Sequence, residues 1–495
     1  MSTFLLSLII FSPLLGVLLI CFVPKNREVL IKAVGVGSTI FTCLLMVLLY
    51  IQSSGGHNYD SFSQKATWFR FGDPELYGKY FSVSYEVGIN GFSFLMIALT
   101  AFLCLLASVA SFKIKTNWKG YFLLFLTLQI GMMGVFAAEN LVLFFIFFEV
   151  TLIPMFFLIG RWGLFEKEKA SYYFLIYNGI GSAILLIVFV LLFAKTGTAN
   201  IEQLQGILQS SDAFSNKAKL TLLIALLIAF GIKLPIFPLH TWVLKVHTQA
   251  PVPIVMVHAG VLLKIGAFGL IRFGIGFFPD QFAHLSFLIA LLGVINLLFG
   301  AFLALKQDDL RLVLAYSSLS HMGIILMGLG AGNESGMQGA VFQVVSHGLI
   351  AAFLFFLIGV LYERTGTTTL SKLGGLAKNM PIASGFLLAG GLASLGLPGM
   401  SGFISEFMAF MGLFQHSPYL AGIATLGMIL TAVYVLKAVL SITFGNEVKL
   451  VGGKDLNRLE WAPALLFIFL IIGIGVYPSL LTNMIQPVLD TMVWG

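Results

Sequence analysis

The stretch LIAFGIKLPIFPLHTW, Leu227 to Trp242, combines three features that seldom occur together. It is apolar enough for the interior of a membrane, it carries one lysine, Lys233, and two prolines, Pro235 and Pro238, follow that lysine closely. Proline removes a backbone hydrogen-bond donor and interrupts a helix. A charged side chain at mid-bilayer costs at least about 2.5 to 3.5 kcal/mol, so it indicates a functional site by default. We therefore predict a membrane helix that is broken beside a functional lysine.

Apolar stretches recur along the whole chain. Of its 495 residues, 59% are hydrophobic and only 10% are charged, which excludes a water-soluble protein. A helix of about 20 apolar residues is long enough to cross the hydrocarbon of a bilayer. Fourteen stretches have this length, so we predict an all-α integral membrane protein. They are residues 3–23, 30–51, 89–112, 120–138, 140–160, 172–194, 219–242, 252–275, 283–305, 309–330, 337–361, 382–408, 418–444 and 461–483. The gaps 52–88 and 195–218 read as external loops, each with room for a hairpin or a short helix.

A second predicted helix is interrupted in the same way as the first. Its stretch SLGLPGMSG, residues 394–402, contains Pro398 among three glycines. Paired interruptions at membrane depth are typical of transport sites. The interval between Pro235 and Pro398 matches the interval between the fourth and ninth spans, which suggests two related five-helix units. We thus expect one polytopic domain, 1–495, with helices 1–3 in 1–118, the first unit with helices 4–8 in 119–275, the second with helices 9–13 in 283–444, and helix 14 in 461–483.

The basic residues predict the orientation. Lys and Arg accumulate in the short loops on the cytoplasmic side of a membrane protein. Most of the 28 Lys and Arg fall in inward loops if both termini lie on the outer, periplasmic side of the cell's inner (cytoplasmic) membrane. The net charge of +7 then reflects topology in the lipid bilayer, and nucleic acid is not implied. Three lysines, Lys233, Lys264 and Lys437, fall in no loop.

Ionisable residues inside the spans are the candidate site. The acidic and basic members that we expect to form a proton path are Glu149, Lys233, Lys264 and Glu406. Five histidines can titrate near neutral pH: His240, His247, His258, His321 and His347. Four of them, His240, His258, His321 and His347, are candidate relays, as is Lys437. Each has a plainer interpretation: Lys437 lies near the inner end of its span, where it can reach the headgroups, and a buried histidine can simply tie two helices together.

A pairing of Glu149 with Lys233 would make a proton switch. Burial disfavours the charged form of lysine and a neighbouring carboxylate favours it. At about 4 Å and an effective dielectric near 20 such a pair is worth about 4 kcal/mol, enough to decide whether the lysine holds its proton. Lys264 could receive the proton next, and Glu406 could deliver it toward the far end. We find no dinucleotide-binding motif, cysteine cluster or metal-ligand spacing, so any electron chemistry belongs to partners.

Five runs of the sequence are specific enough to compare with known families: FFEVTLIPMFFLIGRWG, GIKLPIFPLHTW, QAPVPIVMVHAGVLLKIGAFGLIRF, LAYSSLSHMGIILMG and LGLPGMSGFISEF. Together they resemble the antiporter-like membrane subunits of respiratory complex I, the type I NADH:quinone oxidoreductase. The similarity is greatest to the branch called subunit M, or subunit 4 in mitochondria, and covers nearly the whole chain.

The resemblance implies fourteen helices, two inverted five-helix repeats, and breaks in helices 7 and 12. It places the family's proton path on Glu149, Lys233, Lys264 and Glu406, and a glutamate in the last position resembles subunit M. It implies that this chain binds no cofactor, while NADH, FMN, iron–sulfur clusters and quinone belong to the other membrane and peripheral subunits of complex I. Three alternatives remain at this point: an Mrp-type Na⁺/H⁺ antiporter subunit, a membrane subunit of a related hydrogenase complex, and a structural subunit whose ion pairs only join helices.

Overall fold

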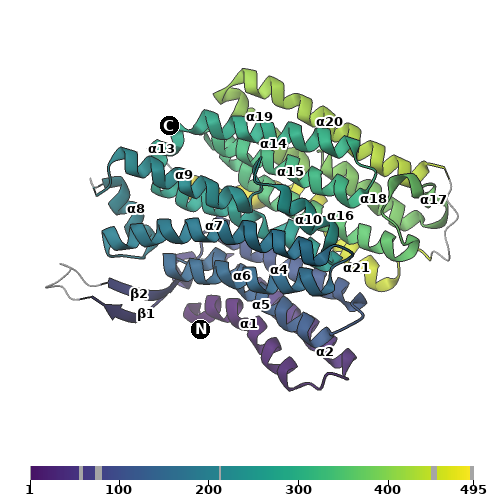
Figure 1. Cartoon of the computed structure of the whole chain (residues 1–495), viewed down its shortest axis with the longest axis horizontal. Coiled ribbons are helices and arrows are strands. Elements are labelled where there is room, and N and C mark those ends of the chain that lie inside the picture. The colour runs from purple at the N-terminus through teal and green to yellow at the C-terminus, as the bar shows by residue number, and fades with distance from the viewer. Residues whose placement is uncertain (1, 55–58, 73–80, 211–212, 447–453, 491–495) are drawn as a thin grey trace.

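The chain folds into one bundle of long helices that run in nearly the same direction (Figure 1). The computed structural model describes residues 2–54, 59–72, 81–210, 213–446 and 454–490. Within these residues, twelve helices are long and apolar enough to cross a membrane. Many of their large apolar side chains face outward, as lipid-facing residues must. The prediction of an all-α membrane protein is thus confirmed.

The crossing helices follow the predicted stretches closely. Their bounds are α1 Ser2–Phe22, α2 Glu28–Ser54, α4 Gly91–Ala110, α5 Trp118–Ala137, α6 Leu141–Trp162, α7 Lys167–Thr196, α14 Ser286–Lys306, α15 Leu310–Gly330, α16 Glu334–Thr365, α20 Pro418–Phe444 and α21 Arg458–Val476. The remaining one, Val252–Ile275, is buried along nearly its whole length. It consists of α11 Val252–Val257, a π-helical turn His258–Leu262, α12 Lys264–Gly269 and a second π-helical turn Leu270–Ile275.

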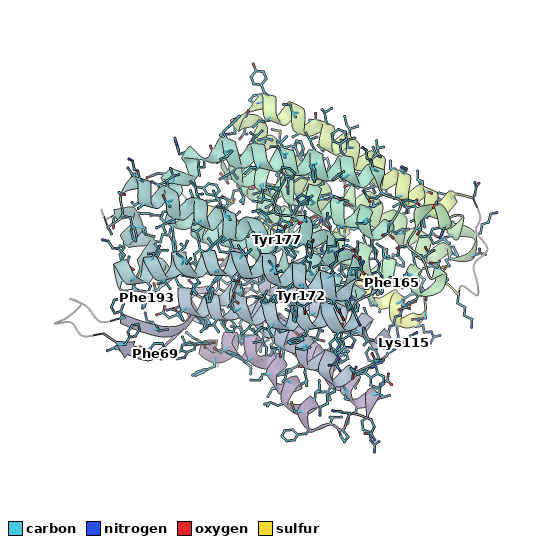
Figure 2. All side chains as sticks on the ribbon, in the orientation of Figure 1. Phe69, Lys115, Phe165, Tyr172, Tyr177 and Phe193 are labelled. Carbon is cyan, nitrogen blue, oxygen red and sulfur yellow. The ribbon has the colours of Figure 1, made fainter. Side chains whose placement is uncertain are left out.

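The two ends of the bundle differ in their side chains and loops. One end, which we name the hairpin end, carries the antiparallel strands β1 Gln64–Phe71 and β2 Phe81–Val87 and the short helix α8 Ile201–Ser210. These occupy the two predicted external loops. The opposite end, the basic end, carries short helix α17 Leu376–Asn379 and the exposed lysine Lys115, far from Phe69 of the hairpin (Figures 1 and 2).

The first and last helices, near the two ends of the described chain, both reach the hairpin end. The hydroxyl of Ser7, near the start of α1, forms hydrogen bonds with the side chains of Gln64 and Tyr85 in the hairpin. Val488, near the end of α22 Ser479–Leu489, lines the same cavity as Lys65 of β1. This arrangement agrees with the predicted placement of both termini on one side, and the assignment of that side as the outer one remains a prediction.

Two predicted spans are present as pairs of shorter helices. The first consists of α9 Asn216–Lys233 and α10 Thr241–Gln249, and the second of α18 Pro381–Ser394 and α19 Ser401–His416. The intervening residues hold Pro235 and Pro238 in one case and Pro398 in the other. Short helix α13 Pro279–His284 and the 3₁₀ turns Tyr59–Phe62, Ser111–Lys113 and Leu370–Lys372 complete the elements.

The predicted last span, 461–483, is not one helix. The chain leaves α21 at Val476 and starts α22 at Ser479, with Pro478 between them. Pro478 lacks the backbone N–H that a continuous helix would need, so the interruption follows from the sequence. The prediction was wrong because the apolar stretch was read without this proline.

The side chain of Asn296 in α14 forms hydrogen bonds with the backbone at the first helix break. Its side-chain Oδ1 accepts a hydrogen bond of 2.7 Å from the Phe237 backbone N–H, and its Nδ2 donates to the carbonyls of Pro235 and Leu319 at 3.3 and 3.2 Å. Asn296 is fully buried. Backbone groups freed by a helix break need such partners where water is excluded.

Replacing Asn296 by alanine is expected to destabilise the protein by about 1 to 3 kcal/mol, because a buried N–H and two carbonyls lose a partner. The midpoint of thermal unfolding of the purified protein in detergent measures this. Asn178→Ala is the matched control, since buried Asn178 donates to Phe174 O within its own helix. Equal midpoints for the two variants would contradict the assigned role of Asn296.

Candidate functional site

Lys233 lies at the last position of α9, directly before the first break. It is buried, and its Nζ atom stands 4.7 Å from the ring centre of Phe148 and 5.7 Å from that of Phe174. An aromatic face attracts a cation, so the two rings stabilise the lysine in its charged form. The lysine before the break is thus buried beside two aromatic rings.

Glu149 of α6 follows Phe148 and is close enough for its charge to act on Lys233. The expected ion pair at about 4 Å is not formed: within the described part of the chain, no oxygen of Glu149 lies within 4.0 Å of the Lys233 amine. Its Oε1 atom is buried without a hydrogen-bond partner among the described residues. The aromatic rings take the position beside the amine that the carboxylate was expected to take.

A pair of histidines comes next. The Nε2 atom of His247 in α10 lies 3.0 Å from Nδ1 of His258, which begins the first π-helical turn. Both side chains are fully buried. The charges of Lys233 and Lys264 both act on His258, so this pair lies within electrostatic reach of both lysines. The sequence predicts His247 only as a group that titrates, because nothing in it shows which side chain faces His258 across the turn at Pro251.

Lys264 connects the histidine pair to the second half of the chain. It is completely buried in α12, and its Nζ lies 2.8 Å from Nδ1 of His347 in α16. The amine also donates to the carbonyl of Ala259. A buried lysine that contacts a histidine on another helix has a proton acceptor within direct reach.

His347, His321 and Glu406 continue the same line. The rings of His347 and His321 are 5.1 Å apart, and Nε2 of His321 is 3.4 Å from Oε1 of Glu406 in α19. His321 also contacts the carbonyls of Ser317 and Ser394 at 2.7 and 3.1 Å. Ser394 is the last residue of α18, so His321 partners the backbone at the second break as Asn296 does at the first.

The structure therefore brings most of the predicted site residues into one line, in which Glu149 is half-buried and the other members are buried. In order along it they are Glu149, Lys233, His258 with His247, Lys264, His347, His321 and Glu406. Two predicted relays lie apart from it. His240 packs on Phe237 and Phe299, and Lys437 is exposed and donates to the Leu305 carbonyl at 3.2 Å.

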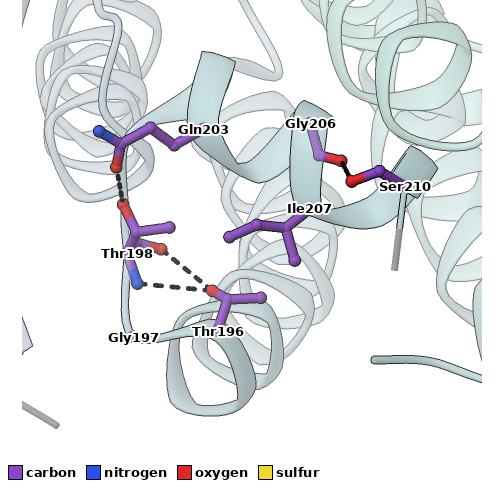
Figure 3. A pocket seen from close by; sticks show the side chains of 7 residues that line it. All are labelled: Thr196, Gly197, Thr198, Gln203, Gly206, Ile207 and Ser210. Atoms are coloured by element: carbon purple, nitrogen blue, oxygen red, sulfur yellow. Dashed lines mark hydrogen bonds between the residues drawn. The ribbon is translucent and has the colours of Figure 1, made fainter. Parts of the chain in front are cut away.

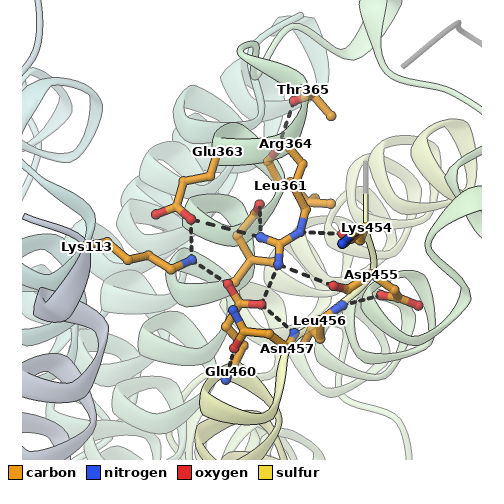
Figure 4. Close-up of polar contacts among 11 residues, drawn as sticks. Lys113, Leu361, Glu363, Arg364, Thr365, Lys454, Asp455, Leu456, Asn457 and Glu460 are labelled. Carbon is orange, nitrogen blue, oxygen red and sulfur yellow. Dashed lines mark hydrogen bonds and ion pairs between the residues drawn. The ribbon is translucent and has the colours of Figure 1, made fainter. Parts of the chain in front are cut away.

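A cavity of about 960 Å³ opens at the basic end of the bundle. We name it the basic-end cavity; its walls include Lys113, Lys115, Arg161, Arg311 and Glu460. Figure 4 shows how Glu460 of α21 joins Lys113 and Arg364 in one ion-pair network. Val252 and Phe356 also line the cavity, and the neighbouring Phe355 packs against His247 at 5.1 Å. Phe355 and His247 themselves are not part of the cavity lining.

A second cavity, of about 820 Å³, opens at the hairpin end. We name it the hairpin-end cavity; its walls include Glu86, Glu139, Asn200, Phe268 and Arg272. The span Val252–Ile275 lines both cavities, one at each of its ends, and holds His258 and Lys264 between them. A third hollow, between α7 and α8, is lined by seven residues without a titratable side chain and takes no part in the line (Figure 3).

No group of three or more His, Cys, Asp or Glu among the described residues has the arrangement of a metal site. The chemistry that the buried line can perform is proton transfer. Each of its members gains or loses a proton on nitrogen or on a carboxylate oxygen. Two of its links are hydrogen bonds, His247–His258 at 3.0 Å and Lys264–His347 at 2.8 Å, and His321 lies 3.4 Å from the Glu406 carboxylate.

Comparisons with known proteins agree on one family. Residues 138–431 match the family model described as NADH:quinone oxidoreductase/Mrp antiporter, TM. The chain is 38% identical to NAD(P)H-quinone oxidoreductase chain 4 1 of Synechococcus sp. (strain JA-2-3B'a(2-13)) over 97% of this chain and 90% of that protein. It is 34% identical to NADH-quinone oxidoreductase subunit M of Rhodobacter capsulatus over 98% of this chain and 95% of that protein.

Solved structures give the same result. A chain of respiratory complex I from Thermus thermophilus with bound NADH matches with a TM-score of 0.85 and 29% identity, covering 98% of both chains. A chain of an archaeal membrane-bound sulfane sulfur reductase matches with a TM-score of 0.85 at 24% identity, covering 97% of this chain and 77% of that one, which shows a shared fold.

Proposed function

Because the chain belongs to the NADH:quinone oxidoreductase/Mrp antiporter family of membrane proteins, we propose that its buried line of Glu, Lys and His residues carries the protons that the complex pumps. The chain is a proton-translocating membrane subunit of a type I NADH:quinone oxidoreductase, of the kind called subunit M or chain 4 in its relatives. It works together with the other membrane and peripheral subunits of that enzyme. NADH, FMN, iron–sulfur clusters and quinone belong to those partners, and this chain supplies the proton path.

The observation that carries the proposal is the series of neighbouring groups from Lys264 to Glu406. Lys264, as an ammonium, donates to neutral His347, and transfer of that proton leaves a neutral amine beside an imidazolium. His347 lies against His321, and His321 lies against the carboxylate of Glu406. The first step joins two atoms 2.8 Å apart, whereas the step from His347 to His321 needs a bridging water, because the two ring centres are 5.1 Å apart.

The first part of the line needs movement. Lys233 rests on Phe148 and Phe174, while Glu149 acts on it from beyond hydrogen-bond distance. Approach of the carboxylate would hold the proton on Lys233, and its withdrawal would release that proton toward His258. The break beside Lys233 gives the side chain the freedom for this exchange. Nδ1 of His247 and Nε2 of His258 are buried without a protein partner among the described residues, and buried polar atoms of this kind are commonly hydrogen-bonded to ordered water that can pass a proton on.

The two cavities and the orientation fit this role. The basic end faces the cytoplasm in our proposal, because basic residues gather on that side of the inner membrane, and the hairpin end with both termini faces outward. The basic-end cavity is then the entry for protons toward His247. We also propose that helices 4–8 and 9–13, residues 119–275 and 283–444, are two repeats of inverted topology. Each contains one broken helix with a buried side chain from a neighbouring helix at its break.

The test is the composition of the native complex. A tagged chain extracted in mild detergent is expected to copurify with NADH-oxidising and iron–sulfur subunits, and the reconstituted complex is expected to acidify the vesicle lumen when NADH is added. Copurification with cation-transport subunits alone, and Na⁺/H⁺ exchange without NADH, would contradict the proposal and identify an Mrp-type antiporter. Glu406 favours the first outcome, because a glutamate at this position is part of the resemblance to subunit M.

A further inference from the structure

The hairpin-end cavity lies close to Lys264 yet does not reach it. Phe268 lines that cavity and lies one helical turn after Lys264, a rise of about 6 Å along the same helix. The Lys264 amine points the other way, onto Ala259 and His347. The short stretch of helix between the cavity and the amine is therefore all that separates a polar cavity from the proposed proton path.

Three phenylalanine rings pack together beside this stretch of helix. The ring of Phe268 packs against Phe92 at 5.2 Å and against Phe136 at 5.1 Å, and all three side chains are buried. Aromatic rings offer no strong hydrogen-bond donors or acceptors, and an apolar constriction of this kind loses its water. A chain of waters from the hairpin-end cavity would be interrupted here.

A fixed positive charge stands on the cavity side of these rings. Arg272, one turn after Phe268, places its guanidinium 5.6 Å from the centre of the Phe268 ring and forms an ion pair with Glu139. Glu86 and Lys65, a second ion pair, line the same cavity. Arginine keeps its charge at any working pH. Glu139 offsets part of that charge, and the guanidinium beside the Phe268 ring disfavours a hydrated proton at this position, as an arginine does in other narrow pores.

We propose that Phe268, backed by Arg272, is the barrier that prevents protons from passing between the hairpin-end cavity and Lys264. This inference rests on the proposed function, because a barrier at this point matters only if Lys264 carries protons. A pump must keep the protons on its path apart from the side with the higher proton concentration. Phe268 does so at the point where the path comes nearest to the hairpin end along this helix. Its role is a positioning one, exclusion of water, and it takes no part in proton transfer itself.

A passive leak assay tests the proposal. The whole complex is reconstituted in liposomes that hold a pH-sensitive dye, a pH gradient is imposed with potassium and valinomycin to balance charge, and neither NADH nor quinone is added. Phe268→Ala is expected to raise the rate of proton entry about tenfold over the wild type, because removal of the ring lowers the free-energy barrier to proton passage. Phe273→Ala is the matched control: Phe273 lies on the same helix, is fully buried, and packs against Phe144 at 4.7 Å, away from the cavity lining.

The outcomes are distinct. A leak in Phe268→Ala, absent in Phe273→Ala and abolished in the double variant F268A/K264M, supports the barrier and its link to Lys264. A wild-type leak rate in an intact Phe268→Ala complex, an equal leak in Phe273→Ala, or a leak that persists in F268A/K264M would overturn it. If Phe268→Ala does not assemble, Arg272→Gln decides, because it removes the charge and leaves the rings in place; an unchanged leak rate overturns the proposal. Since no NADH is used, these results stand apart from the pumping assays that test the proposed function.

Discussion

Replacement of Lys264 by methionine is expected to abolish NADH-driven proton pumping, with quinone reductase activity wholly or partly impaired. Lys264 joins the two halves of the line. Its charge acts on His258 in the first half, and its amine contacts His347 in the second half. A well-positioned proton carrier increases the rate of proton transfer by a factor of about 10² to 10⁴. We therefore expect the pumping rate to fall by about 100-fold or more. Methionine has nearly the same length and apolar volume as lysine, which keeps the buried site filled.

The rate of NADH-dependent acidification in proteoliposomes measures this effect. Lys437→Met is the matched control, because Lys437 is also a lysine in an apolar helix but its amine is exposed and contacts a backbone carbonyl. Wild-type pumping is expected in the control. Wild-type pumping in Lys264→Met would remove the central member of the proposed path.

Replacement of Lys233 by methionine is expected to have an effect of the same size. The reason is the proposed exchange between Glu149 and Lys233. Without an amine beside Phe148 and Phe174, the charge of Glu149 has no cation to act on. No proton can then be passed to His258. Lys219→Met is the control on the same helix, since Lys219 lies near the start of α9 and donates to the Leu208 carbonyl. Equal pumping rates in Lys233→Met and Lys219→Met would show that the lysine at the break is not part of the path.

Much of the fold could be predicted because membrane helices have a nearly fixed length and composition. The apolar stretches gave the helices, Pro235 and Pro398 marked the two breaks, and rare charges inside the spans marked the members of the line. Pro478, which ends the final membrane helix early, was an equally clear signal that the apolar pattern obscured.

The contacts between helices could not be predicted from a single sequence. Asn296 reads as an ordinary polar residue in a helix, and only the fold shows that it partners the broken backbone at Phe237. The approach of His247 to His258 depends on how α10 turns back at Pro251. Lys233 has aromatic rings beside it where a carboxylate was expected, because packing of α6 and α7 decides which side chain fills that space.

The central claim is that protons pass in series through one line of buried groups, and the proton-to-electron ratio of the reconstituted complex tests it most directly. We predict that Lys233→Met, Lys264→Met and the double variant K233M/K264M lower this ratio to the same value, since a path in series is broken as fully by one gap as by two. A wild-type ratio in either single variant, or a double variant that loses clearly more than each single one, would contradict the account.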